Sequence, residues 1–355
     1  GKQWRINSMQ QEQPDKRNKW IVLTLVTAML LPFVFGGCSR PSDEREQEKP
    51  VTPTQIEIRV GIARTLLSTP VIIASELKLL EQHGLRPALT IYHSGKAALH
   101  AMFNGEVDVA TTATTPVVFA SFKRKDFKVL ATIVSSYRDS KLLARRDSGV
   151  ETIHALRGKR VGVHTGTSGQ FFLHGLLAEH GLKASDVVQK TIISPRLPDA
   201  LAEETVDAIA VWEPHAYLTK QKLGDEVVEL PTGESFRTTF NLAVKNDFLD
   251  GHRREMTALL RAIIEADRFI EREPIRAKRI AAARLELKPD LVDALWDEYR
   301  FELSLDQSLI IALESQAQWF IEQGLIEESE TPNYLEFIDT KLMQVVSPTA
   351  MQVIE

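Results

Sequence analysis

Two short runs of hydroxyl residues and glycine follow apolar, strand-like segments of this chain, at Thr111–Thr115 and Thr165–Gly169. Where a strand leads into a helix, hydroxyl groups and the unpaired amides of the helix N-terminus can hold an anion or a polar group. The simpler alternative is that the hydroxyls only cap the helices that follow. The side chains that we expect to contact a ligand are Thr112, Thr114, Thr115, Thr165, Thr167 and Ser168.

Three more candidates differ in chemistry from these hydroxyls. Trp212 ends another strand-like segment and could wall a cleft, stacking on a planar or cationic ligand, although core packing would explain it equally well. Glu213 would repel an anion and suit an amine or a pyrimidine, unless it only supplies negative charge at the start of a helix. Arg64 directly follows the first strand, as an anion contact or as an ordinary surface arginine.

The chain offers no motif that assembles a catalytic centre. Its nine histidines include no His-Glu-x-x-His helix motif. His93, His164 and His215 could form a three-histidine metal site, but their spacing does not enforce one, so singly satisfied histidines are the expectation. Ser168 lies in Gly-Thr-Ser-Gly rather than Gly-x-Ser-x-Gly, and the Walker phosphate-binding pattern is missing. We therefore predict a binding protein rather than an enzyme, with no cofactor and no metal.

Composition narrows the class of partner. The 355 residues are 43% hydrophobic and 26% charged, which is globular, and the net charge of −5 lacks the cationic surplus that nucleic-acid binding needs. The single cysteine excludes an intramolecular disulfide bond. We expect a monomer that binds a small molecule and no nucleic acid.

The elements that must position these residues alternate between short β-type runs and helical periods. Ile56–Ile62 alternates apolar with polar or small residues, and Pro70–Gln82 is typical of a helix closed by Gly84. Such alternation indicates an α/β fold with mostly parallel sheets. The first half also predicts a helix over Gly95–Asn104 and strands over Leu89–Tyr92, Val107–Ala110, Phe127–Val134 and Lys141–Arg145.

The alternation restarts near Glu151 and ends in a helical tail. Met256, Leu259 and Ile263 fall on one helical face, and Pro274 begins a new helix. We predict that residues 55–145 plus 241–355 form lobe 1 and residues 146–240 form lobe 2, with hinge crossovers near residues 144–147 and 240–245. The strands expected after residue 151 are Arg160–Val163, Val187–Ile193, Ala208–Val211, Val227–Leu230 and Asn241–Lys245.

The N-terminal region has the layout of a secretion signal. Basic residues at 16, 17 and 19 precede an uncharged run over residues 20–35, which is short for a membrane span and leads into Gly36, Gly37 and Cys38. Gly-Gly-Cys resembles the lipobox of bacterial lipoproteins, although Phe35 replaces the usual Leu; a plain cleaved signal is the alternative. We expect removal of residues 1–37, acylation of Cys38, and a flexible tether over residues 38–54 that holds the domain at the periplasmic side of the cell membrane.

Three stretches are distinctive as a set: NGEVDVATTATTP at residues 104–116, LRGKRVGVHTGTSGQFFLHGLLAEHGLKASDV at 156–187 and AIAVWEPH at 208–215. Over about residues 56–273 the chain resembles the substrate-binding proteins of ABC importers, in the nitrate, sulfonate, taurine and pyrimidine-precursor group. The resemblance implies a two-lobe, periplasmic-binding-protein-like (type II) fold with a cleft between the lobes and a helical C-terminal segment. It also implies capture of a small anionic or polar ligand for an ABC permease.

Two other functions fit the same scaffold. An enzyme such as a pyrimidine synthase would need the cysteine-rich motif of that relative, and this chain has one cysteine. A sensor domain or accessory lipoprotein would use the same cleft without transport, and fold analogy does not separate the two.

Overall fold

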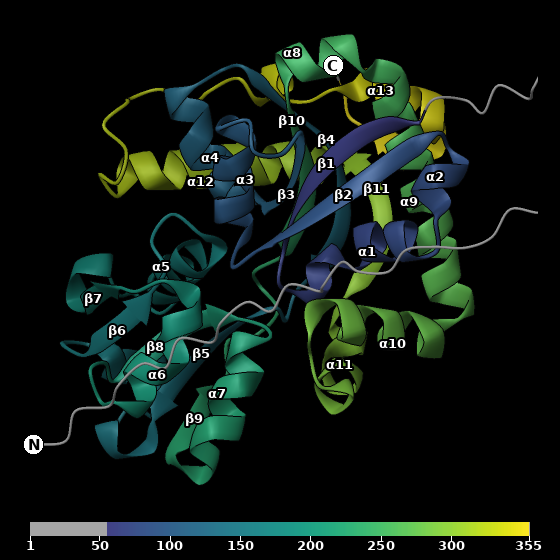
Figure 1. Cartoon of the computed structure of the whole chain (residues 1–355). Helices are drawn as coiled ribbons and strands as arrows, with labels where there is room; N and C mark the ends of the chain where they lie inside the picture. Colours follow the sequence, from purple (N-terminus) through teal and green to yellow (C-terminus); the bar gives the residue numbers. More distant parts are fainter. Residues whose placement is uncertain (1–54, 355) are drawn as a thin grey trace, which may run out of the picture. The chain divides into compact units, whose positions relative to one another are not determined.

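The computed structural model describes residues 55–354, which form two β-sheets with helices packed around them (Figure 1). The expected signal peptide, Cys38 and the tether lie outside these residues. Within residues 55–354, no helix combines the length and the apolar composition that are needed to cross a membrane.

Seven strands form the first sheet: β1 (Ile56–Ala63), β2 (Leu85–Tyr92), β3 (Val109–Ala113), β4 (Phe127–Ser136), β10 (Thr238–Lys245), β11 (Arg300–Asp306) and β12 (Met351–Gln352). Their order is β12-β11-β4-β10-β3-β1-β2. β1 runs parallel to β2 and to β3, whereas β10 is antiparallel to both β3 and β4. β11 is antiparallel to β4 as well. The sheet is therefore mixed, unlike the mostly parallel sheet that the alternation predicts.

The N-terminal helices of this lobe are α1 (Thr69–Glu76), α2 (Leu79–Gln82), α3 (Gly95–Phe103) and α4 (Thr114–Lys123). The single helix expected over Pro70–Gln82 is divided into α1 and α2. Lys78 adopts the left-handed conformation with φ of 57°, which the i to i−4 hydrogen-bonding of a helix cannot continue through.

Five strands form the second sheet, in the order β7-β6-β8-β5-β9. They are β5 (Ser140–Arg145), β6 (Arg160–Val163), β7 (Val188–Thr191), β8 (Ala208–Trp212) and β9 (Val227–Leu230), and the helices among them are α5 (Ser168–Glu179), α6 (Leu197–Ala202) and α7 (His215–Leu223). Leu142 and Leu143 of β5 are buried in different hydrophobic clusters, because successive side chains of a strand point to opposite faces. Both faces of this sheet are covered.

The position of β5 corrects the expected lobe boundary. β5 pairs with β8 and β9, so residues 140–145 belong to the second sheet and not to lobe 1. The chain crosses between the sheets at residues 137–139 and returns at 231–237, ahead of the crossovers expected near 144–147 and 240–245. Within those expected segments, residues 144–145 are paired in β5, residues 146–147 begin a short 3-10 helix, and residues 240–245 are paired in β10. We use lobe 2 for residues 140–230 and lobe 1 for the remainder of the described chain.

The C-terminal part contains a strand in a region where the sequence predicts only helices. Its helices are α8 (Asn246–Gly251), α9 (Arg253–Arg272), α10 (Pro274–Leu285), α11 (Pro289–Leu295), α12 (Gln307–Glu322) and α13 (Thr340–Val346). Between α11 and α12, β11 adds to the first sheet beside β4. Phe301, Leu303 and Leu305 alternate there with polar residues, which is the period of a half-buried strand.

One hydrophobic core joins the two ends of the described chain. Val60 of β1 and Val71 of α1 belong to the same buried cluster as Leu260 and Ile263 of α9 and Leu313 of α12. Burying each such side chain contributes about 1.5–3 kcal/mol. Lobe 1 is thus a discontinuous domain, with lobe 2 inserted between its parts.

Candidate functional site

A small cavity lies where the two lobes meet, with an internal volume of about 20 Å³. That is room for about one water molecule. Lobe 1 and lobe 2 both contribute to the wall, with Asp139 on the first crossover between them. The lining residues are Ala63, Thr65, Leu67, Ser94, Gly95, Lys96, Ala113, Pro116, Asp139, Thr167, Ser168, Trp212 and Phe240.

Two helix N-termini reach this cavity, one from each lobe. α3 begins at Gly95, and the side chain of Ser94 caps it by accepting a hydrogen bond from the amide of Ala97 at 3.2 Å. α5 begins at Ser168, but Thr167 at its N-cap makes no side-chain cap and instead donates its hydroxyl to the carbonyl of His164 at 2.5 Å. The unpaired amides at a helix start carry positive partial charge. Both ends therefore favour a negatively charged group in the cavity.

Lys96 brings a full positive charge to the same place. It follows the first residue of α3, lines the cavity, and donates from Nζ to the carbonyl of Thr165 across the lobe interface at 2.7 Å. Burial and the charge of Lys123 lower the pKa of Lys96. Sequence reasoning missed this residue, because a lysine in the first turns of a helix usually points to solvent.

Glycines on both sides allow the close approach of Lys96 and its helix. Gly166 has φ of +75°, and a Cβ at this position would lie 2.9 Å from Nζ of Lys96. A Cβ on Gly95 would lie 2.9 Å from Cα of Thr112, so α3 can pack this closely on β3 only with glycine. The Ser-Gly-Lys triplet directly after β2 is the sequence signal that could have revealed this half of the site.

Aromatic rings form another part of the wall. Trp212 ends β8, is 7% exposed, and lines the cavity. Its ring centroid lies 6.2 Å from that of His164 and 6.0 Å from that of His215, and His93 of lobe 1 stacks on His164 at 6.0 Å. Burial lowers the pKa of His164 and of His215 to about 4, so both imidazoles are neutral at pH 7. Residues 55–354 contain no group of three or more His, Cys, Asp or Glu side chains arranged to hold a metal ion.

Two buried carboxyl groups lie near the cavity, and only Asp139 lines it. Asp139 accepts a hydrogen bond from the hydroxyl of Tyr299 at 2.9 Å, while burial raises its pKa to about 8. Glu213 is 1% exposed and accepts the amide of Tyr217 at 2.8 Å, and burial raises its pKa to about 7. Asp139 is thus mostly uncharged at pH 7 and can coexist with an anion.

The structure brings together three of the nine expected ligand residues: Thr167, Ser168 and Trp212 line the cavity. Thr112 is buried within β3, which continues through Ala113. The remaining side chains have other partners: Thr114 bonds Thr239, Thr115 bonds Gln316, Thr165 bonds Thr191, Glu213 bonds the amide of Tyr217, and Arg64 bonds Glu286 and the carbonyl of Leu285.

The threonine run at residues 111–115 differs from expectation for a geometric reason. Because β3 extends to Ala113, the N-cap of α4 is an alanine and no threonine caps the helix by its side chain. Thr114 and Thr115 are already helical, and their hydroxyls bond Thr239 and Gln316 at 2.7 Å each. The cavity wall in this region is formed by Ala113 and Pro116.

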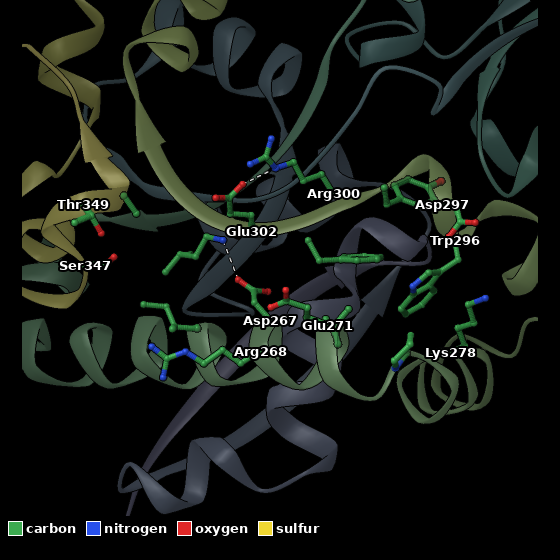
Figure 2. Close-up of a pocket in the computed structure, with 17 residues that line it drawn as sticks. Asp267, Arg268, Glu271, Lys278, Trp296, Asp297, Arg300, Glu302, Ser347 and Thr349 are labelled. Carbon is green, nitrogen blue, oxygen red and sulfur yellow. Dashed lines mark hydrogen bonds and ion pairs between the residues drawn. The ribbon is translucent and has the colours of Figure 1, made fainter.

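A larger cavity lies elsewhere in lobe 1, and we call it the α9 groove (Figure 2). Its volume is about 870 Å³. Its walls are residues 264–271 of α9, Pro274 and Lys278 of α10, and side chains within residues 296–303 and 347–350. None of the nine expected ligand residues lines it.

Comparisons with known proteins agree with the two-lobe architecture. The NMT1-like family matches residues 52–285. A Bacillus subtilis (strain 168) protein that is named for binding aliphatic sulfonates is 27% identical to this chain over 251 residues. The aligned part covers 68% of this chain and 72% of that protein.

Two solved structures share the fold. The alkanesulfonate-binding protein SsuA from Xanthomonas axonopodis pv. citri, bound to MOPS, has a TM-score of 0.71 at 21% identity and covers 80% of this chain and 98% of its own. The periplasmic nitrate-binding protein NrtA from Synechocystis PCC 6803 has a TM-score of 0.65 at 15% identity and covers 83% of this chain and 89% of its own. Residues 55–354 thus have the periplasmic-binding-protein fold.

Proposed function

Since the chain belongs to the NMT1-like family, we propose that it is the extracytoplasmic solute-binding component of an ABC import system and that its cargo is a small organic sulfonate. The ligand binds between the lobes, against Lys96, the N-termini of α3 and α5, and Trp212. The relatives named for sulfonate binding support this choice of cargo.

The observation that carries the proposal is the position of Lys96. Its ammonium group comes from lobe 1 and meets Thr165 of lobe 2 at 2.7 Å, beside the start of α5. A sulfonate has three acceptor oxygens and one negative charge, so it suits one lysine together with backbone amides. The indole of Trp212 then contacts the organic part of the ligand.

The acids in the region do not contradict an anionic cargo. The carboxyl of Glu213, which on sequence favoured an amine or a pyrimidine, accepts a hydrogen bond from the amide of Tyr217. Its carbonyl accepts a hydrogen bond from Thr65 across the lobes at 3.3 Å, so the residue has a role in the lobe contact. The raised pKa of Asp139 leaves that carboxyl uncharged beside the sulfonate.

Calorimetry of the chain against a matched panel tests the cargo. The panel is an alkanesulfonate, nitrate, a pyrimidine, and an alcohol of the same carbon skeleton as the sulfonate. We expect the sulfonate to bind at least about 100-fold more tightly than the alcohol, which corresponds to about 2.8 kcal/mol, because only the sulfonate makes several charge-assisted hydrogen bonds. Tight binding of the pyrimidine alone, or equal binding of sulfonate and alcohol, would contradict the proposal.

Lobe movement accompanies binding in this proposal. The cavity of about 20 Å³ is too small for a sulfonate, so the lobes must separate at the crossovers 137–139 and 231–237 to admit it and close again around it. Small-angle scattering should give a smaller radius of gyration with the sulfonate than without it. A ligand that binds tightly with an unchanged radius would contradict hinge closure.

Lipid anchoring at Cys38 completes the proposed role. The basic, apolar and Gly-Gly-Cys order supports it, and a tether over residues 38–54 would keep the monomer close to an ABC permease. Cells fed labelled palmitate should mark the wild-type chain and not Cys38→Ala. Labelling that persists in the variant would exclude this anchor, and uptake of labelled sulfonate that is independent of the gene would exclude the import role.

A further inference from the structure

The wall of the cavity between the lobes has an apolar part that belongs almost entirely to one lobe. Except for Trp212 of lobe 2, the apolar side chains in the wall come from lobe 1; they are Ala63, Leu67, Ala113, Pro116 and Phe240. Apolar surface that is exposed to a binding cavity favours contact with the carbon atoms of a ligand. Lobe 1 therefore offers a surface for the organic part of a ligand in addition to Trp212.

Phe240 is the largest of these lobe 1 side chains, and the sheet fixes its position. In β10 it pairs directly with Ala113 of β3 and with Val134 of β4. Residues that are paired in this way share a face of the sheet, so the ring of Phe240 lies beside the side chain of Ala113. Phe240 is 3% exposed and belongs to the hydrophobic core of lobe 1. The ring is therefore a packed part of the wall, which a ligand does not displace easily.

The far edge of the Phe240 ring reaches the start of α3. A Cβ on Gly95 would lie 3.0 Å from Cε2 and 3.1 Å from Cζ of Phe240, so the ring lies against the first residue of this helix. Lys96, which brings the positive charge, is the next residue along the chain. An anion that binds Lys96 and the amides at the start of α3 thus has the ring of Phe240 close to its carbon chain.

The space beside the ring is small and does not depend on lobe movement. The cavity has a volume of about 20 Å³, and its neighbouring wall residues Ala63 and Leu67 are buried in the same hydrophobic core. Separation of the lobes widens the gap between them, but it leaves the distance from Phe240 to Gly95 unchanged, because both residues belong to lobe 1. Close-packed core side chains resist being pushed aside. The ring of Phe240 therefore limits the room for a ligand on this side.

We propose that Phe240 determines the length of the carbon chain that the site accepts, and that it restricts the cargo to short alkanesulfonates such as methane- and ethanesulfonate. This inference rests on the proposed function, because it takes the ligand to be a sulfonate bound at Lys96. The carbon chain of the ligand runs from Lys96 towards Phe240, with Trp212 on the side of lobe 2. A chain that is longer than ethyl meets the ring.

Calorimetry of the chain with methane-, ethane-, butane- and hexanesulfonate tests the role of Phe240. The quantity to compare is the ratio of the Kd for butanesulfonate to the Kd for ethanesulfonate, because a change in folding stability alters both constants alike. In the wild type we expect a ratio of at least about 10, since a methylene that does not fit its pocket weakens binding about 10- to 200-fold. In Phe240→Ala the longer chain fits, and the ratio should fall below about 1, since each buried methylene strengthens binding about fourfold.

Two further variants complete the test. Phe320→Ala removes a fully buried ring from the same hydrophobic core but outside the cavity wall, and it should keep the wild-type ratio. Phe240→Leu retains an apolar side chain of smaller size and should give an intermediate ratio, so it takes the place of Phe240→Ala if that variant unfolds.

Three results would overturn the proposal: a wild-type ratio of about 1 or lower, the wild-type ratio in both Phe240 variants, or an equal fall of the ratio in Phe320→Ala. If none of the sulfonates binds, the proposed function fails and this inference fails with it. If the sulfonates bind but the ratio does not depend on residue 240, the import function is unaffected and only the role of Phe240 is lost.

Discussion

The cavity between the lobes and the α9 groove differ in volume, about 20 Å³ against about 870 Å³, and in the groups that determine their charge. Between the lobes, positive charge comes from Lys96 and from two helix N-termini. The groove is lined by side chains of both charge types, which are Asp267, Glu271, Asp297, Glu302, Arg268, Lys278 and Arg300. Each cavity also contains one aspartate whose pKa burial raises to about 8.

The comparison shows that a shifted carboxyl pKa does not by itself indicate the charge of the ligand. Desolvation disfavours the charged form of Asp139 and of Asp267 alike. What differs is the surroundings of the aspartate: Lys96 and two helix N-termini line one cavity, whereas carboxylates and cationic side chains together line the other.

Removing the ammonium between the lobes should have the largest effect. In Lys96→Met we expect the Kd for the sulfonate to rise about 10- to 150-fold, because a hydrogen bond to a charged group contributes about 1.5–3 kcal/mol. Lys125→Met removes the same charge at an exposed position outside the cavity and serves as the control. If calorimetry gives both variants the wild-type Kd, Lys96 does not contact the sulfonate.

The affinity for the sulfonate should depend on pH through Asp139. Asp139 is uncharged below its pKa of about 8 and negative above it, so sulfonate affinity should fall above pH 8, by up to about tenfold per pH unit.

The charged and titratable groups around Asp139 are Tyr299, Glu213, Glu298 and Lys141. Lys96 also loses charge at high pH, so Asp139→Asn is needed as a control. In this variant the affinity for the sulfonate should no longer change near pH 8. A sulfonate profile that is the same in the wild type and in Asp139→Asn would contradict a role of Asp139 in the pH dependence.

The hydroxyl at the start of α5 should have a moderate effect. Thr167→Val removes a cavity hydroxyl that donates to the carbonyl of His164, and we expect sulfonate Kd to rise about two- to tenfold, the value of one neutral hydrogen bond. Thr114→Val is the matched control, because Thr114 bonds Thr239 outside the cavity. An equal loss of affinity in both variants would point to general destabilisation rather than to ligand contact.

Arg64→Gln should have the smallest effect. Arg64 does not line the cavity between the lobes, and its guanidinium pairs with the exposed carboxylate of Glu286 at 2.7 Å. We expect a change in sulfonate Kd of less than about twofold and a loss of unfolding free energy of about 0–1 kcal/mol. Calorimetry and urea unfolding measure the two quantities, and a large loss of affinity would restore Arg64 as a ligand contact.

Local sequence patterns predicted most strands and helices because alternation and helical periods survive in short windows. The helix that begins at Ser168 and the one that begins at Pro274 are examples. β11 was not predicted, although Phe301, Leu303 and Leu305 alternate with polar residues, because helical segments precede and follow this short strand. The sheet to which β5 belongs could not be predicted from the local sequence, because it depends on the pairing of β5 with β8 and β9.

The candidate site was predicted in part for a similar reason. A glycine-rich turn before a helix identifies a helix N-terminus, and so Thr167 and Ser168 were found. The direction of a side chain depends on distant partners, and Arg64 finds Glu286 more than 200 residues later. Lys96 and Asp139 enter the site only because the two lobes meet there. No sequence window contains that contact.

The insertion of β10 between β3 and β4 sets an order in which the chain can fold during synthesis. β1, β2 and β3 can pair among themselves early, but β4 has no partner among them and must wait for β10 at residues 238–245. All five strands of lobe 2 lie within residues 140–230 and are complete before β10 is made. We expect lobe 2 to fold first on the growing chain, while β4 stays unpaired until its neighbour is synthesised.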